Sequence, residues 1–166
     1  GERIYGFMKD MQSIWDAENV FNRGKIIDTP KMNTSLRYEG IKPQNITTYY
    51  SFENQKGLLC AIEQCNGSAD CRKSLQAGGK MCPTFQITNQ ESQTPRARAN
   101  ILREKLSFPT KENPFKDKEI KQILDDCLMC KACKNECPSN VDITKLKSEF
   151  LQHYYDATYY PLNILL

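Results

Sequence analysis

Four closely spaced cysteines limit the fold of this chain more than any other feature. They form a C-x2-C-x2-C-x3-C-P run that consists of Cys127, Cys130, Cys133 and Cys137, with Pro138 after the last cysteine. In this spacing a backbone wraps around a cubane iron–sulfur cluster, and the first three thiolates hold three of its corners. The cysteine beside the proline binds the other cluster in proteins that hold two. The run therefore predicts that another segment supplies the missing ligands.

A second group of cysteines meets this requirement. Cys65 and Cys71 are followed by Cys82, which stands before a proline as Cys137 does. If each proline-adjacent cysteine binds the cluster of the other segment, two ligand sets follow. The first set is complete and fits a 4Fe-4S cluster; it consists of Cys82, Cys127, Cys130 and Cys133. The second set has only three thiols, which are Cys65, Cys71 and Cys137.

The sequence leaves the fourth corner of the second cluster open. If Cys65 and Cys71 hold the first and third positions of a C-x2-C-x2-C pattern, Ser68 falls at the middle one. A serine ligand, an iron capped by water, or a 3Fe-4S cluster without that corner would each satisfy the pattern. Cys60 is the other candidate, but its apolar neighbours favour a small buried hydrophobic residue. We therefore expect a second cluster of the 4Fe-4S or 3Fe-4S type.

Zinc is the alternative occupant of these cysteines. Four thiolates can hold a structural zinc ion, and paired C-x2-C knuckles often do so. The third cysteine at the same spacing and the adjacent proline favour a cubane instead. Clustering of the eight cysteines also favours metal or cluster binding in a reducing cytoplasm over disulfides. The alternative function is a zinc-stabilised structural or interaction module without a redox role.

Charge and hydropathy exclude other classes of function. The 23 Lys and Arg residues exceed the 20 Asp and Glu residues by only three, which gives no electrostatic case for a nucleic-acid partner. No apolar run approaches the length of a bilayer span, so no transmembrane segment is predicted. No nucleophile–base pair, glycine-rich phosphate loop or pair of catalytic carboxylates can be argued. We therefore predict no catalytic residues in this chain.

The spacing of apolar residues predicts a mainly α-helical fold. Residues 1–22 have one apolar face at helical spacing, and Gly24 follows as a cap or turn. Residues 28–57 lack long periodicity and predict an irregular connector, with a short strand near residues 47–52. Asp142 is the predicted N-cap of the last helix. The further predicted helices are at residues 96–106, 116–126 and 143–155.

Other polar residues near the cysteines have more than one reading. Arg96 and Arg98 would shape the electric field around a cluster, bind an anionic headgroup or form structural salt bridges, and salt bridges are favoured. Lys131 and Lys134 would offset the negative charge of a cluster, or only be solvated. His153, the single histidine, is expected to be inert.

Several of these motifs resemble a known family. They are Cys65-Asn66-Gly67, Cys71-Arg72-Lys73, Met81-Cys82-Pro83-Thr84, Arg96-Ala97-Arg98-Ala99-Asn100 and the segment from Cys127 to Val141. Together they resemble the iron–sulfur region of FAD-linked oxidases of the D-lactate and D-2-hydroxyglutarate dehydrogenase type. The region is also similar to the cluster subunits of glycerol-3-phosphate and succinate dehydrogenases. Upstream, residues 21–26 resemble the Asn-Pro-Gly-Lys-Ile close of the flavin oxidase domain, with Arg23 in place of proline.

This resemblance implies a domain organisation. Residues 58–166 would form an alpha-helical ferredoxin-like domain with two clusters, preceded by a connector at residues 39–57. Residues 1–38 would be the C-terminal tail of an FAD-linked oxidase domain. FAD would then bind in the missing upstream part of the same full-length protein, and this chain would be a fragment of it.

The resemblance also implies a function. The chain would be the electron-transfer iron–sulfur module of an FAD-dependent 2-hydroxy acid dehydrogenase. It would pass electrons from the reduced flavin to a quinone or a redox protein acceptor. The implied location is the cytoplasm, or a peripheral position at the inner face of the membrane.

Overall fold

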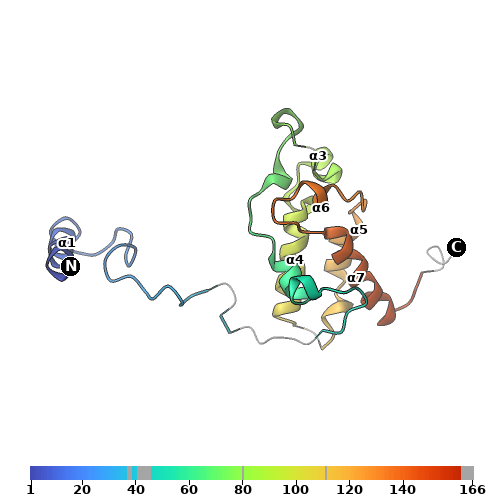
Figure 1. Ribbon diagram of the computed structural model, residues 1–166, viewed down its shortest axis with the longest axis horizontal. Coiled ribbons are helices and arrows are strands. Elements are labelled where there is room, and N and C mark those ends of the chain that lie inside the picture. The colour runs from blue at the N-terminus through green and yellow to red at the C-terminus, as the bar shows by residue number, and fades with distance from the viewer. Residues whose placement is uncertain (37–38, 41–45, 80, 111, 162–166) are drawn as a thin grey trace. The chain divides into compact units, whose positions relative to one another are not determined.

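The structure is a computed structural model that describes residues 1–36, 39–40, 46–79, 81–110 and 112–161. The chain divides into two compact units, Gly1–Ile41 and Lys42–Leu166 (Figure 1). The described residues form seven α-helices and several short 3-10 turns but no strand, so the prediction of a mainly α fold is confirmed. Among the described helices, none combines the length and apolar character that a membrane crossing requires.

The first unit contains one helix, α1 (Glu2–Trp15). This helix is shorter than the predicted one, because the carboxylate of Asp16 accepts the backbone N–H groups of Val20 and Phe21 at 2.7 and 2.9 Å and turns the chain. Gly24 adopts a left-handed φ of 65°, as expected of a turn residue. No residue of α1 is buried, and its apolar side chains are exposed.

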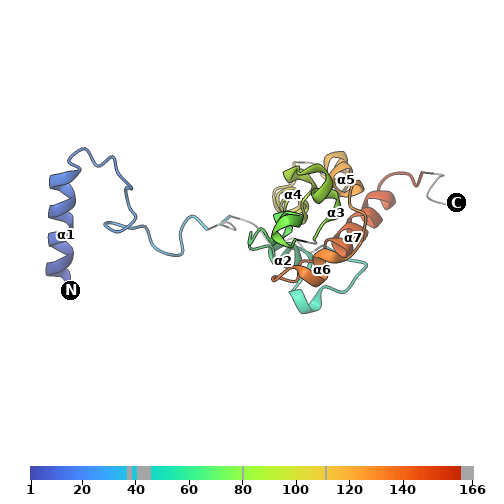
Figure 2. The same cartoon turned by 90° about the horizontal axis from the view of Figure 1, so that it is seen from above.

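The second unit is a bundle of helices. Its α-helices are α2 (Leu58–Glu63), α3 (Pro83–Thr88), α4 (Pro95–Ser107), α5 (Lys118–Asp125), α6 (Ala132–Glu136) and α7 (Ile143–Asp156). The 3-10 turns are η1 (Glu53–Gln55), η2 (Asp70–Arg72), η3 (Leu75–Ala77), η4 (Glu91–Gln93) and η5 (Pro114–Lys116). Figure 2 shows the short α6 leading into the long α7.

Polar caps set where the long helices begin. Asp142 accepts the backbone N–H of Lys145 at 3.0 Å, which confirms it as the N-cap of α7. Thr94 caps α4 in the same way, through the N–H of Ala97 at 3.0 Å. Each cap satisfies a backbone donor that the helix cannot pair itself, which contributes about 1 kcal/mol. The helices predicted at residues 96–106, 116–126 and 143–155 are therefore confirmed within two residues at each end.

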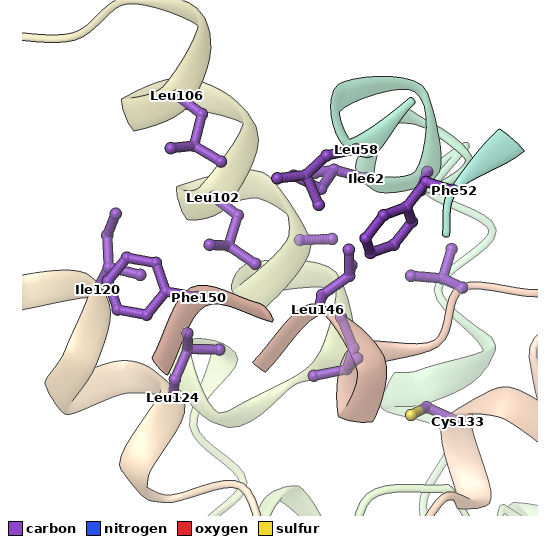
Figure 3. Close-up of a cluster of buried hydrophobic side chains, with 14 of the residues drawn as sticks. Phe52, Leu58, Ile62, Leu102, Leu106, Ile120, Leu124, Cys133, Leu146 and Phe150 are labelled. Atoms are coloured by element: carbon purple, nitrogen blue, oxygen red, sulfur yellow. The ribbon is translucent and has the colours of Figure 1, made fainter. Parts of the chain in front are cut away.

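The core lies between α2, α4, α5 and α7. Figure 3 shows their apolar side chains pointing toward one another, with Cys133 at the edge of the cluster. Its labelled members are Phe52, Leu58, Ile62, Leu102, Leu106, Ile120, Leu124, Leu146 and Phe150. Complete burial of such a side chain contributes about 1.5–3 kcal/mol. This core holds α2, α5 and α7 in place. The segment with Cys65, Cys71 and Cys82 follows α2, and the run from Cys127 to Cys137 lies between α5 and α7.

The predicted strand near residues 47–52 is wrong. The backbone N–H groups of Tyr49 and Tyr50 donate to the two carboxylate oxygens of Glu149, each at 2.9 Å. A side chain of α7 therefore takes the donors that a neighbouring strand would have taken. Part of the predicted connector, residues 41–45, lies outside the described residues.

Candidate iron–sulfur centre

Seven of the eight cysteines line two hollows in the helical unit. The first hollow is lined by Cys82, Cys127, Cys130 and Cys133. The second is lined by Cys65, Cys71, Cys133 and Cys137. The first group matches the predicted four-thiol set, and the second contains the predicted three-thiol set together with Cys133. All eight thiols are free, so each one in the hollows is available as a ligand.

The hollows share a wall. Cys133, which is 7% exposed, lines both of them. Pro95, the first residue of α4, also lines both. Two groups bound in these hollows would thus be separated by side chains rather than by solvent.

The backbone around the cysteines adopts strained conformations. Cys82, Met129 and Lys131 have left-handed φ values of 58°, 53° and 63°, and Ala69 has 64°. Such conformations cost about 1–3 kcal/mol each for residues other than glycine and gather at ligand sites. Alternation of right- and left-handed residues turns successive N–H groups toward one concave side, a geometry found at many iron–sulfur sites. The backbone that surrounds the first hollow therefore suits an anionic cluster.

Helix starts face two of the three buried thiols. Burial raises the pKa of Cys71, and the backbone N–H of Arg96 in the first turn of α4 opposes this rise. Burial likewise raises the pKa of Cys133, opposed by the N–H of Ile143, the first residue of α7. The N-terminus of a helix stabilises negative charge. Bound thiolates would therefore be stabilised at both positions.

One buried hydroxyl tests whether a cluster fits the first hollow. Thr144 lines this hollow, and its Oγ1 atom is buried and has no hydrogen-bond partner among the described residues. An unsatisfied buried hydroxyl costs about 1–3 kcal/mol. The sulfur atoms of a cluster accept hydrogen bonds, and such bonds are one of the ways in which proteins tune clusters. Together with the four thiols, this free donor fits a 4Fe-4S cluster.

Comparison with known proteins agrees with this geometry. Residues 61–141 match the 4Fe-4S dicluster domain family. We call this segment the dicluster domain because of this similarity. It contains every cysteine of both hollows. The match therefore supports an iron–sulfur domain of the electron-transfer type.

The dicluster domain and the residues around it also resemble curated enzymes. The chain is 25% identical over 202 residues to D-2-hydroxyglutarate dehydrogenase of Escherichia coli (strain K12), an alignment that covers 98% of the chain and 19% of that protein. The enzymes of the same name from Pantoea ananatis and Haemophilus influenzae are 24% and 23% identical and cover 98% and 92% of the chain. The chain thus spans about a fifth of the length of these relatives. No solved structure matches it.

In the dicluster domain the two arginines of α4 have different partners. Arg96 forms an ion pair with Glu91 at 2.7 Å and lines the second hollow, so the expected salt bridge is confirmed there. For Arg98 that expectation is wrong. Its buried guanidinium donates to the Sγ of Cys82 at 3.3 Å. Each hollow of the dicluster domain therefore has one arginine of α4 in its lining.

The two lysines of the cysteine run also differ. Lys131 lines the first hollow. Lys134 lies 3.6 Å from a carboxylate oxygen of Asp142 and lines neither hollow of the dicluster domain.

Two polar residues of α7 escaped the sequence-based prediction: Thr144, which lines the first hollow, and Lys147, which contacts the backbone of one of its cysteines. Lys147 is 7% exposed, and its Nζ donates to the backbone oxygen of Cys127 at 2.8 Å. Burial lowers the pKa of this lysine. Thr144 and Lys147 are three residues apart and so share a helix face with Ile143. The sequence signal that could have identified Thr144 and Lys147 is their position as polar residues on an otherwise apolar helix face.

Ser68 and Cys60 lie in different surroundings. Ser68 lines the second hollow together with its three expected thiols. Cys60 lines neither hollow and is exposed, so its interpretation as a buried hydrophobic residue is wrong. Helix α2 directs Leu58 and Ile62 into the core and leaves Cys60 at the surface.

His153 belongs to the aromatic part of the core rather than to a hollow. Its ring stacks on Phe115, with 4.2 Å between the ring centroids, and its Nε2 lies 3.0 Å from Glu149. No three His, Cys, Asp or Glu side chains are arranged around a single ion anywhere in the described chain. The thiols of the dicluster domain surround two hollows instead, whereas structural zinc requires four ligands about 2.0–2.3 Å from one point.

Proposed function

We propose that this chain is the electron-transfer iron–sulfur module of an FAD-dependent 2-hydroxy acid dehydrogenase. The observation that carries the proposal is the pair of adjacent hollows, each lined by cysteines and separated by Cys133. The names of the relatives support a hydroxy acid as the substrate of the full-length protein. Electrons would come from reduced flavin and leave to a quinone or a redox protein acceptor.

We propose specific ligands for both clusters. The first, a 4Fe-4S cluster, would be held by Cys82, Cys127, Cys130 and Cys133. The second, of the 4Fe-4S or 3Fe-4S type, would be held by Cys65, Cys71 and Cys137, with Ser68 at the open corner. The linings of the two hollows support these sets. Cys133 lines both hollows, and we assign it to the first because its spacing from Cys127 and Cys130 fits one cubane.

The chain's own residues give the clusters a suitable environment. When bound, iron–sulfur clusters supply one-electron transfer. Left-handed residues such as Met129 and Lys131 give the backbone a geometry that suits N–H groups turned toward an anion. Ile143 and Arg96 present the starts of two helices to the buried thiolates. Apolar residues of the core exclude water from one side of the site.

We further propose that FAD binds in another domain of the same protein. Residues 1–38 would belong to that domain, residues 39–57 would connect it, and residues 58–166 would form the iron–sulfur domain. The exposed apolar side chains of α1, with Trp15 83% exposed, support this view because the flavin domain would cover them. We place the protein in the cytoplasm or at the inner face of the membrane, where reducing conditions preserve free thiols.

Anaerobic reconstitution with iron and sulfide tests this function. The 166-residue chain should become brown, bind iron and sulfide, and give an EPR signal after reduction by dithionite. The same preparation should be analysed for zinc. A colourless protein that takes up stoichiometric zinc and no iron would instead support the zinc-stabilised interaction module.

A further inference from the structure

The guanidinium of Arg98 is the most deeply buried charge next to the first hollow. The residue is 1% exposed and is held by three hydrogen bonds. Nη1 donates to Cys82 Sγ at 3.3 Å, Nη2 to Gln93 Oε1 at 2.9 Å and Nε to the Ile123 carbonyl at 3.2 Å. The amide and carbonyl oxygens are uncharged. Within the described residues Arg98 forms no ion pair, so no carboxylate neutralises its charge by direct contact. The carboxylate of Asp126 is linked to it only through Gln93, whose Nε2 donates to Asp126 at 2.6 Å.

Arg96 provides an internal comparison. It lies two residues earlier on the same helix and lines the second hollow, but Glu91 accepts two of its hydrogen bonds, at 2.7 and 2.9 Å. Glu91 also pairs with Arg72 at 2.9 Å, so two arginines share one carboxylate. The charge of Arg96 is therefore partly balanced. Helix α4 thus presents a partly balanced arginine to one hollow and an arginine without an ion pair to the other.

An uncompensated cation in a dry site acts strongly on a nearby redox group. Charges interact several-fold more strongly there than in water, and salt screens buried charges much less than exposed ones. Reduction makes a cluster more negative by one charge, so a fixed positive charge beside it favours the reduced state. Arginine suits this role because its guanidinium stays protonated, whereas a buried lysine readily loses its proton.

We propose that Arg98 positions Cys82 and sets the reduction potential of the centre on Cys82, Cys127, Cys130 and Cys133. The inference rests on the proposed function and adds a residue that determines how readily this centre accepts an electron. In the step concerned, the reductant loses one electron and the centre gains it. Arg98 keeps its proton throughout, so no proton is taken up at this residue. The hydrogen bond from Arg98 to the Cys82 thiolate becomes stronger as the thiolate becomes more negative, which further favours the reduced state.

An EPR-monitored redox titration tests the proposal. The variants are Arg98→Met, which removes the charge, and Arg98→Lys, which retains a cation. Arg103→Met is the matched control, since Arg103 lies on α4 and contacts Asn100 instead of a cysteine. In Arg98→Met the equilibrium constant for one-electron reduction should fall at least tenfold, a shift of about 59 mV to lower potential. Arg98→Lys should recover part of this shift, and Arg103→Met should match the unchanged chain.

A second measurement does not depend on folding of the Arg98 variants. In Arg96→Met protein labelled with 15N-arginine, Arg98 is the only arginine that lines either hollow within the described residues. Pulsed EPR of the reduced first centre should then show 15N hyperfine coupling from its guanidinium. Absence of that coupling, or an unchanged potential in fully loaded Arg98→Met, would overturn the inference and leave the proposed function standing. Failure of the unsubstituted chain to bind iron would refute both the inference about Arg98 and the proposed function.

Discussion

The carboxylate of Glu149 accepts the backbone N–H of Tyr49, a residue one hundred positions earlier in the chain, at 2.9 Å. Its other oxygen accepts the N–H of Tyr50. Glu149 is 0% exposed, and His153 lies within hydrogen-bonding distance of it. One buried acid therefore fastens the segment that enters the helical unit to the last helix of that unit.

Glu149→Gln should destabilise the helical unit by about 1–3 kcal/mol, because the new NH2 group replaces one of the two acceptor oxygens and leaves one backbone N–H without an acceptor. Chemical denaturation followed by circular dichroism would measure the free energy of unfolding. Glu119→Gln is the control: Glu119 is 58% exposed and pairs with Lys105 at the surface, so the change should cost less than about 0.5 kcal/mol. Equal losses in the two variants would contradict the role of Glu149.

Cys130→Ser should remove the first cluster and leave the second, because Cys130 lines only the first hollow. Iron content after anaerobic reconstitution should fall by roughly half on the two-cluster assignment. Cys60→Ser should leave iron content unchanged, since Cys60 lines neither hollow. Loss of iron in Cys60→Ser would show that Cys60 is a ligand.

Ser68→Cys should convert the second centre into a stable 4Fe-4S cluster. Ser68 already lines the second hollow with three thiols, and a fourth thiolate would hold the iron at the open corner. The iron-to-protein ratio and the EPR spectrum before reduction would reveal the change. Ser92→Cys adds a thiol away from both hollows and should have neither effect. Identical spectra for the two variants would place the open corner elsewhere.

Thr144→Val should have opposite effects on the cluster-free and the loaded protein. Without a cluster it removes an unsatisfied buried hydroxyl and should stabilise the fold by about 1 kcal/mol. In the loaded protein it removes a hydrogen-bond donor from the first hollow and should lower the reduction potential. Ser107→Ala removes the other such hydroxyl, which lines neither hollow. The reduction potential of the Ser107→Ala variant should stay unchanged. An equal shift in both variants would exclude a local role for Thr144.

Removal of the clusters should loosen the cysteine segments and spare the core. A bound group stabilises only what it contacts, and the core side chains Leu102, Leu124 and Phe150 line neither hollow. Hydrogen exchange after iron chelation should rise in residues 65–82 and 127–141, while α4, α5 and α7 stay protected. Loss of protection throughout the helical unit would show that the core cannot fold without clusters.

Local information was sufficient to predict the long helices. The α7 helix begins at its cap, Asp142, and buries the expected face of Ile143, Leu146, Phe150 and Tyr154. These signals lie within a few residues of the element that they determine. The spacing of the cysteines likewise indicated a dicluster domain, because a backbone wraps a cubane only with certain gaps.

Interactions between distant segments were not predictable in the same way. The β-favouring residues near Tyr49 suggested a strand, but Glu149 takes their N–H groups from far along the chain. Arg98 was expected in a salt bridge, although it stands four residues before Leu102 on the core face of α4. That spacing indicated its burial, whereas its contact with Cys82 depends on how two segments pack.

Cys60 has a practical consequence for work with this protein. It is exposed on α2 and lines neither hollow, whereas the other seven thiols line them. Once those seven are engaged, a maleimide or a gold surface would meet a single reactive thiol. The thiol of Cys60 is therefore a defined attachment point, through which the domain could be bound to an electrode without altering a proposed ligand.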